Sequence, residues 1–306
     1  MIKRQRPIWT AAACSSALLL ALTACGGGNS ASSAASSPAA SSPAPSASAS
    51  ATASASASPT APASASPSAS PSASPSPSAS SAPAETNAAP AYRMNKVYNI
   101  VPIDKTKSPD KVVLLTFDDG PKEKVMLTRI LDALDKHHAK AIFFVNGYRI
   151  KAHPELLKLI DDRGQVIGNH SYDHIMLGKE KEAKIRDQIE SVQKMVHDVV
   201  GKTPVFFRPP FASANDAVHQ IAKENDLLFM TWSNGSLDWD LGKNVKNKPQ
   251  AVIDNVMKQL HPGSNILMHE LEWTSETLDN LLTQLEAKGY SFVDPNSIEL
   301  TTAAAK

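Results

Sequence analysis

Residues 112–121 read Val-Val-Leu-Leu-Thr-Phe-Asp-Asp-Gly-Pro, an apolar run that ends in two adjacent carboxylates and a Gly-Pro pair. A short run of β-branched and large apolar residues bounded by turn residues is typical of a buried strand. Two neighbouring carboxylates, Asp118 and Asp119, repel each other in one pocket, so they persist there only with a cation or with separate tasks. This stretch therefore predicts a buried strand that carries a functional site at its carboxyl end.

Apolar runs alternate with amphipathic stretches over the rest of the folded part. Besides residues 112–117, strands are predicted at 141–145, 165–168, 205–207, 227–232, 264–268 and 290–293. Helices are predicted at 124–138, 154–162, 180–200, 215–225, 249–260 and 275–288. The alternation is typical of a parallel α/β architecture, and periodicity alone leaves open both a barrel and a doubly wound sheet.

Polar side chains follow several of these strands. In both architectures the carboxyl ends of parallel strands converge on one face, where sites are built. The residues placed in this way are Asp118, Asp119, His170, Arg208, Asp238 and His269. We therefore expect them to meet in one site.

His170 and His174 are separated by four positions. If residues 169–174 form one helical turn, both imidazoles lie on the same face. Two histidines and one carboxylate form a facial ligand set for zinc or a similar divalent ion. The sequence thus indicates a metal site.

The amino-terminal segment has a different character. Residues 1–6 carry three basic side chains, residues 8–23 are mostly apolar, and Leu22-Thr23-Ala24-Cys25 follows, which is the pattern of a secretory signal. The segment resembles a bacterial lipoprotein signal over residues 1–24, and that resemblance implies lipidation of Cys25. An ordinary secretory signal remains the alternative. The two cysteines, Cys14 and Cys25, both lie in this leader, which excludes a disulfide framework.

Residues 25–91 are almost entirely Ser, Ala and Pro, with no hydrophobic periodicity. Such a stretch cannot offset the entropy of ordering, so we expect a disordered tether with a root-mean-square span of about 45 Å. All 30 acidic residues lie at Glu85 or later. The folded part is therefore close to neutral and lacks the basic footprint of a nucleic-acid-binding protein.

The polar motifs of residues 92–306 resemble, in order, the five motifs of the polysaccharide deacetylases, the NodB-homology carbohydrate esterases. The matching stretches are Thr116–Pro121, His170–His174, Arg208–Phe211, Asp238-Trp239 and Leu267–His269. The resemblance implies a distorted (β/α) barrel of about seven parallel strands. It also implies metal-dependent removal of acetyl groups from sugars.

The resemblance also implies a role for each motif residue. Asp118 would be the general base, held ionised by Arg208, and His269 the general acid, oriented by Asp238. One divalent ion, expected to be zinc with cobalt or manganese as alternatives, would be held by Asp119, His170 and His174. The backbone N–H of Phe211 would help to bind the oxyanion, while Trp239 and Leu267 would line the acetyl pocket.

These interpretations predict a monomeric, lipid-anchored enzyme of the cell envelope, facing the periplasm or the exterior, that deacetylates peptidoglycan. Chitin-type oligosaccharide, exopolysaccharide and acetylxylan remain alternative substrates, because Gly235 replaces an Asp found in many family members. A non-catalytic glycan-binding lipoprotein is the alternative from another functional class. It would have lost the base, a ligand or the acid, and none of these is missing from the sequence.

Overall fold

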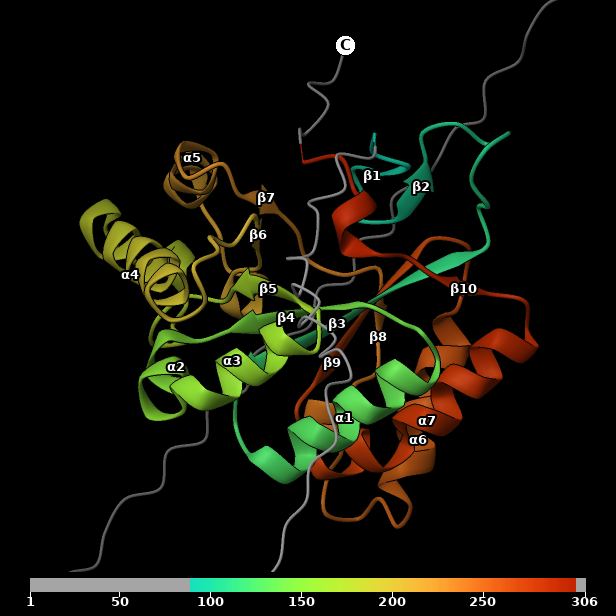
Figure 1. The fold of residues 1–306 in the computed structure, drawn as a ribbon. Coiled ribbons are helices and arrows are strands. Elements are labelled where there is room, and N and C mark those ends of the chain that lie inside the picture. Colours follow the sequence, from blue (N-terminus) through green and yellow to red (C-terminus); the bar gives the residue numbers. More distant parts are fainter. Residues whose placement is uncertain (1–88, 301–306) are drawn as a thin grey trace, which may run out of the picture. The chain divides into compact units, whose positions relative to one another are not determined.

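The computed structural model describes residues 89–300 (Figure 1). The predicted signal segment, the lipidation site Cys25 and nearly all of the predicted tether lie outside the described residues. Within residues 89–300, no helix is both long enough and apolar enough to cross a membrane.

A sheet of eight parallel strands forms the centre of the described domain. Seven of them run in the spatial order β7-β6-β5-β4-β3-β9-β8, and β10 pairs with the first two residues of β3. Their bounds are β3 Val112–Gly120, β4 Ala141–Val145, β5 Val166–Asn169, β6 Phe206–Phe207, β7 Leu228–Phe229, β8 Asn234–Gly235, β9 Ser264–His269 and β10 Ser291–Phe292.

The sheet curls into an incomplete barrel with β7 and β8 at its edges, which confirms the predicted distorted (β/α) barrel (Figure 1). Every predicted strand is present, although the predicted strand 227–232 keeps strand pairing only at Leu228–Phe229. The two-residue strand β8 was not predicted. This strand pairs with β9 at the edge of the sheet, and the chain continues from it to Asp238.

Helices cover the outer face of the sheet. Contacts between α5 and α4, α4 and α3, α3 and α1, α1 and α7, and α7 and α6 place them in the order of the strands beneath them (Figure 1). Their bounds are α1 Lys124–Lys136, α2 Gly147–Ala152, α3 Pro154–Asp162, α4 Glu182–Val200, α5 Asp216–Glu224, α6 Lys248–Gln259 and α7 Glu272–Ala287. Of the α-helices within residues 89–300, only the short α2 was not predicted from the sequence pattern.

The alternation of β3 decides which side chains enter the barrel. Leu115 and Phe117 belong to the core beneath the helices, whereas Val112 and Leu114 belong to the inner core. Successive strand residues point to opposite faces, so Thr116 and Asp118 continue the inner row. A charged group buried there costs several kcal/mol, of the order of 3–5, unless it is paired.

A two-stranded hairpin that was not predicted closes the amino-terminal end of the barrel. It consists of β1 (Tyr92–Met94) and β2 (Ile100–Pro102), which pair antiparallel. Tyr92 and Ile100 belong to the same buried cluster as Val112. The Ile100 N–H donates to the carbonyl of Gly263, at 2.8 Å. The opposite end of the barrel carries the polar residues.

Candidate active site

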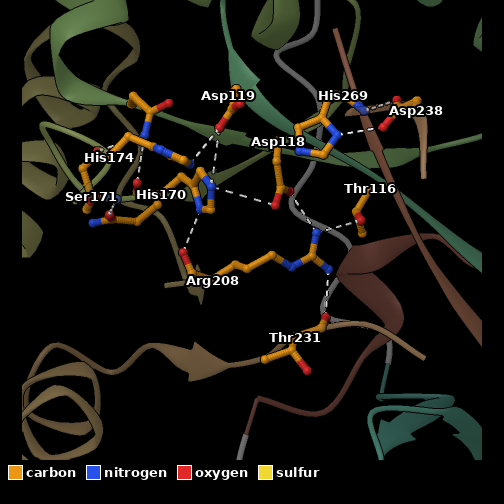
Figure 2. A network of polar contacts seen from close by, with 12 residues as sticks. Thr116, Asp118, Asp119, His170, Ser171, His174, Arg208, Thr231, Asp238 and His269 are labelled. Atoms are coloured by element: carbon orange, nitrogen blue, oxygen red, sulfur yellow. Dashed lines mark hydrogen bonds and ion pairs between the residues drawn. The ribbon is translucent and has the colours of Figure 1, made fainter. Parts of the chain in front are cut away.

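The polar motif residues meet at the carboxyl ends of the parallel strands, as predicted (Figure 2). Each comes from the last residues of a strand or from the loop that follows it: Asp118 and Asp119 from β3, His170 and His174 after β5, Arg208 after β6, Asp238 after β8 and His269 from β9. Thr231, which follows β7 and was not predicted, joins them through its backbone carbonyl. Positions far apart in the sequence therefore form one site.

A β-bulge explains how two adjacent carboxylates reach the same site. The register of β3 against β4 shifts between Asp118 and Gly120, and Asp119 has φ of 68°. In a regular strand the two side chains would point to opposite faces. With the bulge, His170 Nε2 lies 3.7 Å from Asp118 Oδ2 and 3.5 Å from Asp119 Oδ1. The left-handed residue costs about 1–2 kcal/mol, which Asp tolerates better than most residues.

The segment with His170 and His174 is a loop, so the helical turn considered for it is wrong. Positive φ angles at Ser171 (63°) and His174 (55°) turn the chain instead, and the two rings lie 5.1 Å apart between centroids. Asn169 Oδ1 accepts the Ser171 N–H at 2.9 Å, and Asn146 Nδ2 donates to the His170 carbonyl at 2.7 Å. Side-chain amides therefore fix the loop.

Asp119, His170 and His174 could hold a divalent cation. One ligand atom from each lies within 4.8 Å of the other two. His170 Nδ1 hydrogen-bonds to the Arg208 carbonyl at 2.6 Å, so its proton is on Nδ1 and the Nε2 lone pair faces Asp119. Asp119 Oδ1 is buried without a hydrogen-bond partner among the described residues, and His174 Nε2 is 3.0 Å away. Two imidazole nitrogens and a carboxylate oxygen directed at one point fit zinc.

The charge of Asp119 suits the same role. Burial alone would raise the pKa of this carboxyl group, but the imidazoles of His170 and His174 directly beside it outweigh burial. The net effect holds the pKa of Asp119 far below its usual range. Asp119 is therefore ionised, which suits the binding of a divalent cation.

Arg208 is fully buried and pairs with Asp118. Its Nη1 donates to Asp118 Oδ1 and to Thr116 Oγ1, both at 2.7 Å, and its Nη2 donates to the Thr231 carbonyl at 2.8 Å (Figure 2). Removing one partner of such a buried pair costs about 3–5 kcal/mol, because the other charge stays buried. The pair thus holds Asp118 in one orientation.

His269 and Asp238 form a second pair on the other side of Asp118 (Figure 2). Asp238 Oδ1 bonds His269 Nδ1 at 2.7 Å, and Asp238 Oδ2 accepts both the His269 N–H and the Thr274 hydroxyl, each at 2.7 Å. Burial by itself would lower the pKa of His269, but the hydrogen bond and charge of Asp238 more than compensate and raise it. His269 is therefore suited to carry a proton.

The three predicted substrate-binding residues surround these pairs. Phe211 is exposed, has φ of 58°, and packs the edge of its ring on His174 with centroids 4.7 Å apart. Trp239 is also exposed and lies 5.2 Å from the His269 ring. Leu267 is buried on β9, two residues before His269 and on the same side of the strand.

The sequence analysis missed Glu270, which directly follows His269. Its side chain is fully buried, and Oε2 accepts the Lys122 N–H at 2.9 Å. Burial raises the pKa of Glu270 to about 7, against the opposing effects of Lys122 and Arg149. A single Glu after a strand has no sequence signature that distinguishes it from a solvated loop residue, so only its position beside His269 could have drawn attention to it.

Comparisons with known proteins agree with this geometry. A family model described as polysaccharide deacetylase matches residues 105–230. The peptidoglycan-N-acetylmuramic acid deacetylase PdaA of Bacillus subtilis is 35% identical over 185 residues, which cover 60% of this chain and 69% of that protein. A peptidoglycan-N-acetylglucosamine deacetylase of Bacillus cereus is 35% identical over 199 residues, which cover 63% of this chain and 70% of that protein.

A solved structure of a relative bears on activity. A carbohydrate esterase family 4 pseudoenzyme from Bacillus anthracis is similar with a TM-score of 0.56 and 33% identity, over 60% of this chain and 63% of that one. A mutant of it is described as having restored enzymatic activity. Since overall similarity extends to an inactive relative, the completeness of the site matters here. Together, the matched family model and the relatives place this chain in the polysaccharide deacetylase family, carbohydrate esterase family 4.

Proposed function

We propose that this polysaccharide deacetylase is a metal-dependent enzyme that removes N-acetyl groups from the amino sugars of peptidoglycan. The observation that carries the proposal is the assembly of the complete constellation in one place. The Asp118–Arg208 pair, the ligand set of Asp119, His170 and His174, and the His269–Asp238 pair all lie at the carboxyl end of the barrel. The names of the two Bacillus relatives support peptidoglycan as the substrate.

The chain supplies a base and an acid on neighbouring strands. Asp118 lies beside His269 in the β3–β9 register, so one side chain can take a proton from the attacking water while the other gives one to the departing nitrogen. Arg208 keeps Asp118 aimed at the site, and Asp238 does the same for His269. The Phe211 N–H would help to neutralise the oxyanion. A divalent ion bound by Asp119, His170 and His174 would supply Lewis-acid activation of the acetyl carbonyl and the water.

The metal proposal is tested by removing one ligand. His174→Ala should weaken zinc binding by at least about 100-fold, because the two remaining ligands cannot complete the site. Elemental analysis of the purified full chain measures zinc occupancy directly. The control is His197→Ala, which removes an exposed histidine of α4 and should keep full occupancy. Full zinc occupancy in His174→Ala would overturn the ligand assignment.

The acid–base proposal predicts a shift in the pH dependence of kcat/KM. His269 must be protonated to act as the acid, and Asp238 raises its pKa, so wild-type activity extends to higher pH. Asp238→Asn removes the charge, and the alkaline limb of the profile should move about 1–2 pH units lower. The acidic limb should stay near its place.

The matched control for this profile is Asp240→Asn, at an exposed position two residues further on, which should leave both limbs unchanged. A shift of the acidic limb in Asp238→Asn, with the alkaline limb fixed, would contradict the roles given to Asp238 and His269.

The substrate is tested by acetate release from purified peptidoglycan, chitooligosaccharides and acetylxylan. We expect the full chain to release acetate from peptidoglycan, and Asp118→Asn to reduce the rate by about 100-fold or more, because it removes the general base. Release from acetylxylan alone, or from chitooligosaccharides alone, would exclude peptidoglycan. Acetate release by the wild type no faster than without protein, on all three substrates, would indicate a non-catalytic glycan-binding protein.

We also propose that the chain is anchored by a lipid on Cys25 in the cell envelope, with residues 25–91 as a tether. The apolar leader that ends in Cys25 supports this, and an insoluble envelope polymer suits a tethered enzyme. Cys25→Ser should move the protein out of the detergent-extractable membrane fraction, whereas Cys14→Ser should not. Membrane retention of Cys25→Ser, measured by cell fractionation, would contradict the anchor.

A further inference from the structure

Among residues 89–300, Glu270 is the one buried carboxylate next to the site to which the proposed function gives no role. Its relative exposure is 0%, and it follows His269 at the point where β9 ends. Charged side chains are rarely fully buried without a partner or a task. Its surroundings therefore indicate what it does.

The backbone pairing of β3 with β9 stops at Asp118 opposite His269. Beyond that pair the bulge at Asp119 begins. Pro121 has no backbone N–H to donate, and the residue after it is Lys122. Glu270 Oε2 accepts the Lys122 N–H at 2.9 Å. Where the backbone pairing of β3 with β9 has ended, the Glu270 side chain thus still attaches the chain after β3 to the end of β9 by one hydrogen bond.

The other side of the bulge is attached by the backbone. Gly120 resumes pairing with Val145, and its carbonyl accepts the Asn146 N–H at 3.0 Å. The segment that follows Asp119 is therefore attached to β4 through Gly120 and to the Glu270 side chain through Lys122. Lys122 adds a contact of its own, since its Nζ lies 3.7 Å from Asp119 Oδ2.

Gly120 and Glu270 occupy complementary space. A Cβ atom placed on Gly120 would lie 1.9 Å from Glu270 Oε1 and 2.8 Å from Glu270 Cδ, so the carboxylate fills the position that a side chain at residue 120 would take. Residue 120 must therefore be glycine, because the Glu270 carboxylate lies too close for any side chain there. Residue 270 and the bulge are thus packed in direct contact.

We infer that Glu270 is a positioning residue: by accepting the Lys122 N–H and packing on Gly120, it holds the bulge that aims Asp119 at the metal site. This inference rests on the proposed metal site, and it assigns to Glu270 a hydrogen-bonding task that requires the length of its side chain. It does not require the negative charge.

Two variants of the full chain separate length from charge. Glu270→Gln keeps the length and an acceptor oxygen, so its zinc affinity should stay close to that of the wild type. Glu270→Asp keeps the charge but is one methylene shorter, so it should bind zinc about 10- to 100-fold more weakly. Zinc affinity is measured on the metal-free protein by competition with a chelator. The control is Glu272→Asp, at an exposed position on α7, which should have no effect.

The exchange of the Lys122 amide, followed by NMR in the metal-free protein, gives a readout that does not depend on zinc. It should be several times faster in Glu270→Asp than in the wild type or Glu270→Gln. If the wild type bound no zinc, the proposed metal site would be wrong. The exchange rate of the Lys122 amide would still show whether Glu270 holds the bulge. Equal exchange in all three proteins, or weaker zinc binding in Glu270→Gln than in Glu270→Asp, would overturn the positioning role.

A second pair of variants tests the packing. Gly120→Ala should abolish tight zinc binding, because its methyl group collides with Glu270. In the double variant with Glu270→Ala the methyl group has room, so the double variant should bind zinc more tightly than Gly120→Ala alone. Equal or weaker binding by the double variant would show that the two positions act independently and would refute the contact.

Discussion

The buried ion pair between Arg208 and Asp118 is the interaction on which the rest of the site depends. The guanidinium is fully buried and stacks over the Phe144 ring, 4.4 Å from its centroid, while it bonds to Asp118 and Thr116 of β3. Burial lowers the pKa of Arg208, and the Asp118 charge opposes that shift. Neither charge is tolerable in the barrel without the other.

The same arginine connects the remaining parts of the site. Its backbone carbonyl fixes the His170 ring through Nδ1, and its Nη2 bonds to the Thr231 carbonyl and to Asn265 Oδ1 on β9, the strand that ends in His269. Asp118, His170 and the strand that ends in His269 are therefore all attached to one residue. A displacement of Arg208 would move groups that must stay aligned to within fractions of an ångström for catalysis.

Backbone strain concentrates at the same end of the barrel. Asp119, Ser171, His174 and Phe211 all have positive φ angles, each of which costs of the order of 1–3 kcal/mol. The Asn146 side chain donates a hydrogen bond to the strained segments, and the Asn169 and Glu270 side chains accept one each from their backbone N–H groups. Strained residues persist only where the surroundings over-determine them. Here they bring the side chains of Asp119, His170 and His174 together, which a regular strand or helix could not do.

The sequence by itself determined the seven principal strands, six of the helices and the convergence of the motif residues. Apolar runs and amphipathic periodicity indicate which faces of the strands and helices must be buried. It did not predict β1, β2, β8 or α2, elements of two to six residues with too little periodicity, whereas the short strands β6, β7 and β10 lie within longer predicted runs. It suggested a helical turn for His170 and His174, because spacing does not reveal left-handed residues.

Only the tertiary structure decided how the site is aimed. The identity of Asp118 and Asp119 is plain in the sequence, but the bulge that turns both toward His170 depends on β4 and on Glu270, which lie far away along the chain. The burial of Glu270 likewise follows from packing against Gly120. Local patterns report what each segment prefers, whereas the direction of a side chain within a site is fixed by the non-local contacts that hold its backbone.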